Sequence, residues 1–224
     1  MSRILPLLHP CKPMKNSGDM NKKGLLIVLS GPSGAGKGTI CSAYLKRNPE
    51  AELSISVTTR KPRVGEKEGV NYYFTDIESF EKMIKENKFL EYAKVYGNYY
   101  GTPREYVEEK LAAGFDVLLE IDIQGALQVK EKFPEGVFIF IIPPSMEELK
   151  RRIVKRGTEN AEAIFTRFQS AYRELNYICQ YNYVVVNDRV EEAVRKIEAI
   201  VLAEKCRVVR NKGLYLGLEG GVNE

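Results

Sequence analysis

The stretch Leu25–Thr39, LLIVLSGPSGAGKGT, decides how the rest of the chain folds. An apolar, β-rich run ends at Ser30, a glycine-rich loop follows, and a segment that favours a helix begins near Lys37. Glycines let successive backbone N–H groups turn toward one point, and the first turn of a helix adds further unpaired donors. The order strand, loop and helix therefore predicts a phosphate-binding loop of the pattern G-x-x-x-x-G-K.

This loop is expected to hold a nucleoside triphosphate, although a turn without a ligand is the alternative. Lys37 would bring a mobile positive charge to the outer phosphates. Gly38 stands where such loops usually carry Ser or Thr, so a direct hydroxyl–magnesium bond from that position is impossible. Magnesium would then be held mainly by phosphates and water. The residues predicted to bind ATP are Gly31, Pro32, Ser33, Gly34, Ala35, Gly36, Lys37, Gly38 and Thr39.

Size and composition restrict the class of protein. The 224 residues, 44% of them hydrophobic, suffice for one α/β domain with insertions or for two small domains. A net charge of +4 with interspersed signs argues against a nucleic-acid or membrane surface. No apolar stretch approaches the length that spans a bilayer. The four cysteines form no CxxC pair, which is typical of reduced thiols in a cytoplasmic protein.

The only histidine, His9, lies in the N-terminal arm. Acid–base catalysis or metal ligation by histidine in the core is therefore excluded, and chemistry must use Lys, Arg, Asp, Glu, hydroxyl groups and an oxygen-bound metal. We expect residues 1–23 to be a disordered arm, with Met20 as a second candidate for the start of translation. We expect residues 208–224, which end in a glycine-rich stretch, to be a flexible tail.

Between these tails, predicted helices alternate with predicted strands. Helices are expected over residues 37–47, 77–87, 104–113, 125–133, 146–155, 161–180 and 190–207. Strands are expected over residues 51–59, 72–74, 115–123, 137–142 and 183–186, with a strand–turn–strand over 91–101. This order predicts an α/β fold of three layers, α/β/α, around a parallel central sheet.

Two segments interrupt the alternation. Residues 54–103 combine short strands, a hairpin and one helix, which predicts an inserted mixed α/β subdomain. Residues 151–167 form an arginine-rich helix–break–helix, which predicts a mobile lid. The core of a domain over residues 24–207 would then comprise residues 24–53, 104–150 and 168–207.

The segment Ser54–Phe74, SISVTTRKPRVGEKEGVNYYF, predicts a second anion site. Arg60 and Arg63 flank Pro62, and tyrosines follow about ten residues later. Two guanidinium groups and phenol hydroxyls can together hold a phosphate dianion. A solvated charged loop is the alternative, but the phosphate-binding loop upstream favours a second phosphate site.

With these two sites, the chain resembles the guanylate kinase family. The resemblance is carried by S-x-T-T-R-x-P-R-x-G-E-x-x-G-x-x-Y-x-F, GPSGAGKGT and L-x-I-D-x-Q-G, and it runs from about Gly24 to Lys205. It implies transfer of the γ-phosphoryl group of ATP to GMP, and also to dGMP, with Mg²⁺, for purine nucleotide metabolism. It further implies a cytoplasmic monomer or homodimer with no nucleic-acid or membrane partner.

The resemblance also implies a GMP pocket. Its members would be Ser56, Arg60, Arg63, Tyr72, Glu91, Tyr100, Thr102 and Asp122, with the two arginines and two tyrosines on the 5′-phosphate. The family often has Ser where this chain has Thr102, and the hydroxyl is kept. Asp122 either contacts the guanine amino group or positions a magnesium-bound water, and the sequence leaves both open.

The chemistry of guanine agrees with this pocket. Guanine offers N1–H and a 2-amino group as donors, so the Glu91 carboxylate can accept from both, whereas it repels the N1 lone pair of adenine. Hydroxyls of Ser56 and Thr102 can donate to O6. A buried polar site of this kind rejects a mismatched base by roughly 10⁴-fold. The alternative is that Glu91 is an ordinary surface acid.

Phosphoryl transfer requires alignment and neutralisation of charge. Besides Lys37, the resemblance implies that Arg152, Arg156 and Arg167 act in catalysis as lid arginines that close over the transferring group and exclude water. Glu120 and Asp122 end a predicted parallel strand, at the edge where ligands bind in open α/β sheets. Asn187 matches a position near the adenine of ATP.

Two other classes fit part of the pattern. An adenylate-kinase-type enzyme would share the phosphate-binding loop but not the segment TTRKPRVGE. A catalytically silent, peptide-binding module of a scaffold protein would resemble the whole domain, but such modules tend to lack an intact loop and to be joined to other modules.

Overall fold

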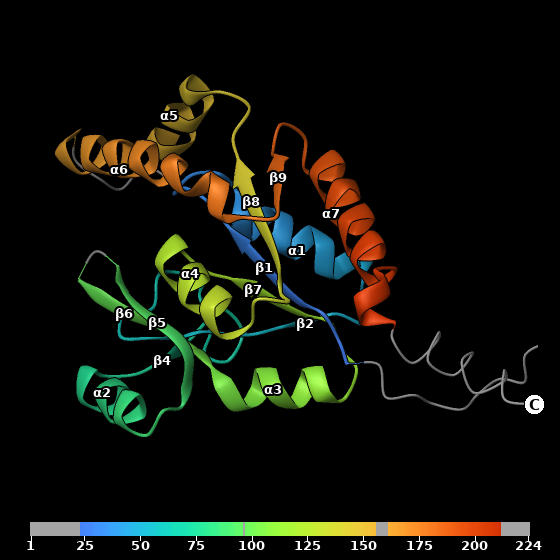
Figure 1. Cartoon of the computed structure of the whole chain (residues 1–224). Coiled ribbons are helices and arrows are strands. Elements are labelled where there is room, and N and C mark those ends of the chain that lie inside the picture. Colours follow the sequence, from blue (N-terminus) through green and yellow to red (C-terminus); the bar gives the residue numbers. More distant parts are fainter. Residues whose placement is uncertain (1–22, 96, 156–160, 212–224) are drawn as a thin grey trace, which may run out of the picture.

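The computed structural model describes residues 23–95, 97–155 and 161–211, and a five-stranded sheet forms its centre (Figure 1). The strand order is β2-β7-β1-β8-β9, and every neighbouring pair is parallel. The strands are β1 (Leu26–Ser30), β2 (Glu52–Leu53), β7 (Val117–Glu120), β8 (Val137–Ile142) and β9 (Tyr183–Val186). The three inner strands are apolar nearly throughout because helices cover both of their faces.

Two pairs of helices make these covering layers. α1 (Lys37–Arg47) and α7 (Val190–Lys205) pack on one face, where Tyr44 and Ile197 meet Leu29 and Ile139. α3 (Arg104–Ala112) and α4 (Ile123–Lys132) pack on the other. Figure 1 shows the sheet between these two layers. The predicted three-layer α/β/α fold is confirmed.

A second sheet of four strands lies beside α3 and α4 (Figure 1). Its order is β4-β3-β6-β5, with β3 (Val57–Thr58), β4 (Tyr73–Phe74), β5 (Phe89–Val95) and β6 (Asn98–Pro103). β5 and β6 are antiparallel neighbours. α2 (Ile77–Lys85) covers this sheet through Phe80, whose ring stacks on Phe89 at 4.4 Å. Asp76 caps α2 by accepting from Ser79 N, as predicted.

α5 (Met146–Lys155) and α6 (Ala161–Glu174) lie at the end of the molecule opposite to α2 (Figure 1). Leu149 and Ile153 of α5 pack against Ala171 of α6 in a small apolar cluster. A 3₁₀ helix over Leu175–Gln180 continues from α6. Within the three described ranges, no helix is both long and apolar enough to cross a membrane.

Several predicted elements differ in extent from the structure, and three of them differ most. The strand expected over residues 51–59 is two strands in different sheets, β2 and β3, because Ser54 N still donates to Leu118 O while Ser56 O already accepts from Tyr73 N. The strand expected to reach residue 123 ends at Glu120. The helix expected to reach residue 180 ends at Glu174 and becomes the 3₁₀ helix. The predicted arm and tail and the break at 157–160 fall wholly or largely outside the described residues.

Candidate active site

The phosphate-binding loop connects β1 to α1 with a backbone that only glycine can adopt. Gly31, Gly34 and Gly36 have φ values of 140°, 90° and 90°. A Cβ atom on Gly31 would lie 2.2 Å from Ile141 O, so β8 approaches the loop too closely for any side chain. Gly36 is the N-cap of α1, and no cap side chain therefore competes with a ligand for the first amides of the helix.

Two charged side chains already engage this loop. The Lys37 ammonium donates to Gly31 O at 2.5 Å and to Pro32 O at 3.3 Å, so it lies across the loop. Ser33 N donates to a carboxylate oxygen of Glu174 on α6 at 3.3 Å. The loop thus attracts an anionic oxygen. Glu174 was missed from the sequence, and its separation of 141 residues from Ser33 left no signal for it.

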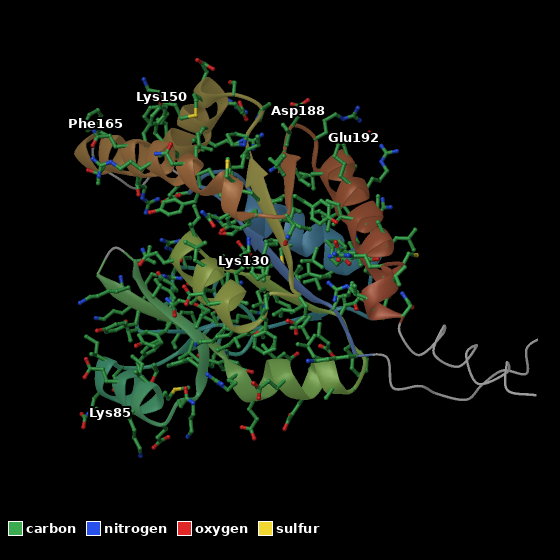
Figure 2. All side chains as sticks on the ribbon, viewed as in Figure 1. Lys85, Lys130, Lys150, Phe165, Asp188 and Glu192 are labelled. Carbon is green, nitrogen blue, oxygen red and sulfur yellow. The ribbon has the colours of Figure 1, made fainter. Side chains whose placement is uncertain are left out.

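A cavity of about 280 Å³ opens beside the loop. Figure 2 shows Asp188, one of its lining residues, at the turn between β9 and α7. Asn187 is buried, and its side-chain amide donates to Ala35 O at 2.7 Å. The remaining lining residues are Gly34, Gly36, Thr39, Arg152 and Val190. The cavity therefore brings Asn187 and Arg152, both singled out from the sequence, to the phosphate-binding loop.

The three arginines predicted to act in catalysis do not share one location in the structure. Arg152 donates to Asn187 O at 3.0 Å and to Glu148 Oε1 at 2.6 Å, which orients its guanidinium over the cavity. Arg167 is half-buried on α6. Arg156 lies outside the described residues. The structure thus joins one of the three to the loop.

Arg60, Tyr72 and Tyr100 form one cluster on the second sheet. The Arg60 guanidinium lies 5.3 Å from the centre of the Tyr72 ring, and the rings of Tyr72 and Tyr100 meet edge to face at 5.9 Å. Although burial lowers the pKa of Arg60, its hydrogen bonds with Glu66 and Tyr100 raise that pKa above the usual value. A fixed cation with adjacent phenol groups is suited to a phosphate dianion.

Glu66 orients this cluster and was not assigned a role from the sequence. Arg60 Nη2 donates to both Glu66 oxygens, at 2.9 and 3.0 Å. The backbone N–H of Arg63 donates to Glu66 at 2.8 Å, which closes the loop around one carboxylate. The spacing R-x-x-R-x-x-E was visible in the sequence and is the signal that could have identified it. The Arg63 side chain itself is exposed.

Glu91 and Thr102 form a buried polar pair where β5 and β6 meet. Glu91 is 3% exposed, so it is not a surface acid, and the Thr102 hydroxyl donates to its Oε1 at 2.5 Å. Burial raises the pKa of Glu91 to about 7, the hydrogen bond from Thr102 opposes the rise, and the charge of Asp122 adds to it. Asp122 caps α4 by accepting from Gly125 N at 2.9 Å. Ser56 is half-buried beside β3.

Glu120, at the end of β7, lies against the start of α1. A Cβ atom on Gly38 would lie 3.3 Å from Glu120 Oε1. Burial raises the pKa of Tyr72, and the negative charge of Glu120 raises it further. Glu120 therefore lies beside the start of α1, and its charge acts on Tyr72 of the second cluster. Glu120 ends β7 and the phosphate-binding loop follows β1, both at the carboxyl edge of the parallel sheet, where open α/β sheets bind ligands.

Known proteins resemble this chain over most of its length. The family model described as guanylate kinase matches residues 23–204. Guanylate kinase of Caldanaerobacter subterraneus subsp. tengcongensis is 66% identical over 88% of this chain and 96% of the relative, and that of Clostridium tetani is 63% identical over 91% and 98%. The crystal structure of guanylate kinase from Anaplasma phagocytophilum superposes with a TM-score of 0.76 at 38% identity, covering 89% of this chain and 96% of that one. The chain belongs to the guanylate kinase family.

Proposed function

We propose that this protein transfers the γ-phosphoryl group of ATP to GMP and forms ADP and GDP. The observation that carries the proposal is the buried pair of Glu91 and Thr102 on the second sheet, in a chain whose phosphate-binding loop leads into α1. The names of the relatives agree with this activity. The adenylate-kinase-type alternative leaves the buried Glu91 without a role.

ATP would bind at the phosphate-binding loop, with its base in the adjoining cavity. Backbone amides of the loop and of the first turn of α1 would surround the phosphates. Lys37 would leave the carbonyl oxygens of Gly31 and Pro32 and follow the phosphoryl group, because an ammonium on a flexible stem can move with the charge. Asn187 would line the base, and Arg152, which also borders the cavity, would act with Arg156 and Arg167 as a lid arginine.

GMP would bind on the second sheet. Its phosphate would meet Arg60, Tyr72 and Tyr100, and Arg63 would join once its exposed side chain turns inward. Glu91, when ionised, would accept from guanine N1–H and the 2-amino group, while Ser56 and Thr102 would face O6. In this assignment residues 54–103 are a GMP-binding subdomain, residues 151–167 a lid, and the remainder of residues 24–207 the core.

The residues at the edge of β7 fit a magnesium ion. Mg²⁺ prefers oxygen ligands and keeps several waters when it binds a nucleotide. The Glu120 carboxylate lies beside Gly38, the position that lacks the usual hydroxyl ligand, and Asp122 is two residues further along. These carboxylates would hold waters of the ion, and the ion would supply charge neutralisation at the phosphates.

The proposal is tested by a coupled assay of ADP formation from ATP with GMP, dGMP, AMP, CMP or UMP as acceptor. We expect turnover with GMP and dGMP, with kcat/KM at least about 10⁴-fold lower for AMP. Omission of magnesium should abolish turnover. Equal rates with AMP and GMP would favour the adenylate-kinase-type alternative, and no turnover with any acceptor would favour a silent binding module. We further propose a cytoplasmic monomer or homodimer acting in purine nucleotide metabolism, without nucleic-acid or membrane partners.

A further inference from the structure

Gly125, in the first turn of α4, lies directly against the carboxylate of Glu91. A Cβ atom on Gly125 would be 2.3 Å from Glu91 Oε2 and 2.8 Å from Glu91 Cδ. Gly125 does not have a positive φ, so its backbone conformation is open to any residue. Glycine is also among the poorest helix formers. Neither the backbone conformation nor helix stability explains why position 125 is glycine. The explanation is that the Glu91 carboxylate occupies the space that a side chain at this position would need.

The strand that carries Glu91 is tied to α4 on both sides of it. The Gln128 side chain donates to Tyr92 O at 2.8 Å and accepts from Tyr92 N at 3.3 Å. The Lys132 ammonium donates to Leu90 O at 2.5 Å. α4 therefore contacts three consecutive residues of β5. Moving the helix away to accommodate a side chain at position 125 would break these hydrogen bonds.

The Glu91 side chain has little room to move instead. It is 3% exposed, and the Thr102 hydroxyl holds its Oε1 at 2.5 Å. Gly125 leaves the space that Oε2 fills. The Thr102 hydroxyl holds one oxygen, and the glycine gives the other oxygen room, so the carboxylate can keep this plane. Guanine presents two adjacent donors, N1–H and the 2-amino group. A carboxylate can accept from both at once only if its plane is aligned with the base.

We propose that Gly125 is a specificity-determining positioning residue, whose missing side chain keeps the Glu91 carboxylate in the orientation that selects guanine. The inference rests on the proposed guanine-reading role of Glu91. A methyl group at position 125 forces the carboxylate to rotate away from Thr102 and from the base. Gly125 itself would touch neither ATP nor GMP. It acts through Glu91 alone, so its effect must vanish when Glu91 is absent.

The test is a double-mutant cycle of Gly125→Ala and Glu91→Ala, with GMP and AMP as acceptors. We expect Gly125→Ala to lower kcat/KM for GMP at least tenfold, mainly through KM for GMP, and to reduce the preference for GMP over AMP. KM for ATP should stay within twofold. In the Glu91→Ala background, Gly125→Ala should not lower kcat/KM for GMP any further, and it should not lower the thermal unfolding midpoint. Glu131→Ala, an exposed residue on the same helix outside the motif L-x-I-D-x-Q-G, is the control.

The possible results separate the two claims. If Glu91→Ala leaves GMP use intact, the proposed role of Glu91 fails, and this inference fails with it. If Glu91→Ala impairs GMP use while Gly125→Ala does not, or if the two losses multiply independently, only the role of Gly125 is overturned. Should Gly125→Ala alone fail to fold, recovery of a folded chain in the double variant supports the conflict with Glu91. Failure of both variants to fold overturns it.

Discussion

At the scale of single residues, the buried carboxylate of Glu91 combines a stability cost with a proposed function. Burial makes its ionised form unfavourable, and the nearby Asp122 adds repulsion, while the Thr102 hydroxyl and the more distant Lys132 favour the charge. Its pKa is raised to about 7, so small changes around neutral pH alter its charge. A guanine base would supply the two donors that the ionised form lacks.

The affinity for GMP should therefore depend on pH through Glu91. If guanine binds the ionised form as proposed, the Kd for GMP should rise as pH falls below about 7, by up to about tenfold per pH unit. Calorimetric titrations between pH 5.5 and 8.5 measure this. Glu91→Gln should remove the dependence, leaving only the titration of the GMP phosphate itself, whose second pKa is about 6. Identical pH profiles for the two proteins would contradict the assignment.

Glu91 should also make the folded state less stable at high pH. Its pKa is higher in the folded than in the unfolded chain, so the native state binds more protons between the two values. The contribution of Glu91 to stability is thus fully present below about pH 4.5 and is lost as pH rises through about 7. Urea unfolding should find Glu91→Gln gaining stability relative to the unaltered protein from pH 5 to pH 8. A difference in the free energy of unfolding between the two proteins that stays constant from pH 5 to pH 8 would refute this prediction.

Lys37 is the residue on which turnover should depend most strongly. Lys37→Ala removes the mobile charge from the outer phosphates, and we expect kcat to fall by about 10²- to 10³-fold. The Kd for GMP should stay within about twofold, because the proposed GMP residues other than Asp122 lie on or beside the second sheet. Steady-state kinetics and calorimetry check the two parts. Lys46→Ala, an exposed lysine at the other end of α1, is the control, and equal turnover of Lys37→Ala and wild type would refute the role.

At the scale of elements, the segment from Arg60 to Glu66 shows how a loop can hold a charged group in place without regular secondary structure. The Arg60 and Glu66 side chains are 13% and 19% exposed, so their ion pair is screened less than a surface pair. Glu66 also accepts from the backbone of Arg63. One carboxylate therefore fixes both the shape of the loop and the direction of the Arg60 guanidinium.

Removing Glu66 should weaken GMP binding although Glu66 has no proposed contact with GMP. In Glu66→Ala the guanidinium loses both of its carboxylate hydrogen bonds, and we expect KM for GMP to rise about tenfold, with KM for ATP unchanged. Lys67→Ala, an exposed neighbour, should behave as wild type. A lower KM for GMP in Glu66→Ala would contradict this prediction. It would mean that Glu66 competes with the phosphate of GMP for Arg60.

Most elements were predictable because their local signals agree. Asp76 and Ser145 accept hydrogen bonds from the first turns of α2 and α5, and β8 and β9 begin and end where the apolar runs do. The run from residue 51 to 59 was misjudged because alternation indicates an extended chain but not its partner. Its first residues pair with β7 and its last with β6, so the extended chain passes from one sheet to the other.

At the scale of the whole molecule, the central sheet joins segments of the chain that are far apart in sequence. Leu118 on β7 is fully buried in the cluster that also contains residues of α1 and α7. Leu118→Ala should lower the free energy of unfolding by about 2–5 kcal/mol, a large part of a typical total of about 5–15 kcal/mol. Leu202→Ala, which alters a side chain that is 66% exposed, should change it by less than about 0.5 kcal/mol.

Urea unfolding followed by circular dichroism measures both variants, and the slope with denaturant should be unchanged. A loss below about 1 kcal/mol for Leu118→Ala would mean that the two helices on this face contribute little to the cooperative core. The same sheet carries the phosphate-binding loop at the end of β1, so we expect turnover to require its integrity as well.

The sequence by itself determined the phosphate-binding loop, the alternation that makes a three-layer fold, and the residue types that could hold a second phosphate and a guanine. These follow from local rules, since glycine conformation, apolar periodicity and capping act within a few residues. Only the tertiary structure decided that Glu174 reaches the loop, that Glu66 orients Arg60, and that Gly125 faces Glu91. Contacts between residues far apart in sequence depend on how close-packed elements fit together, and no local pattern encodes that fit.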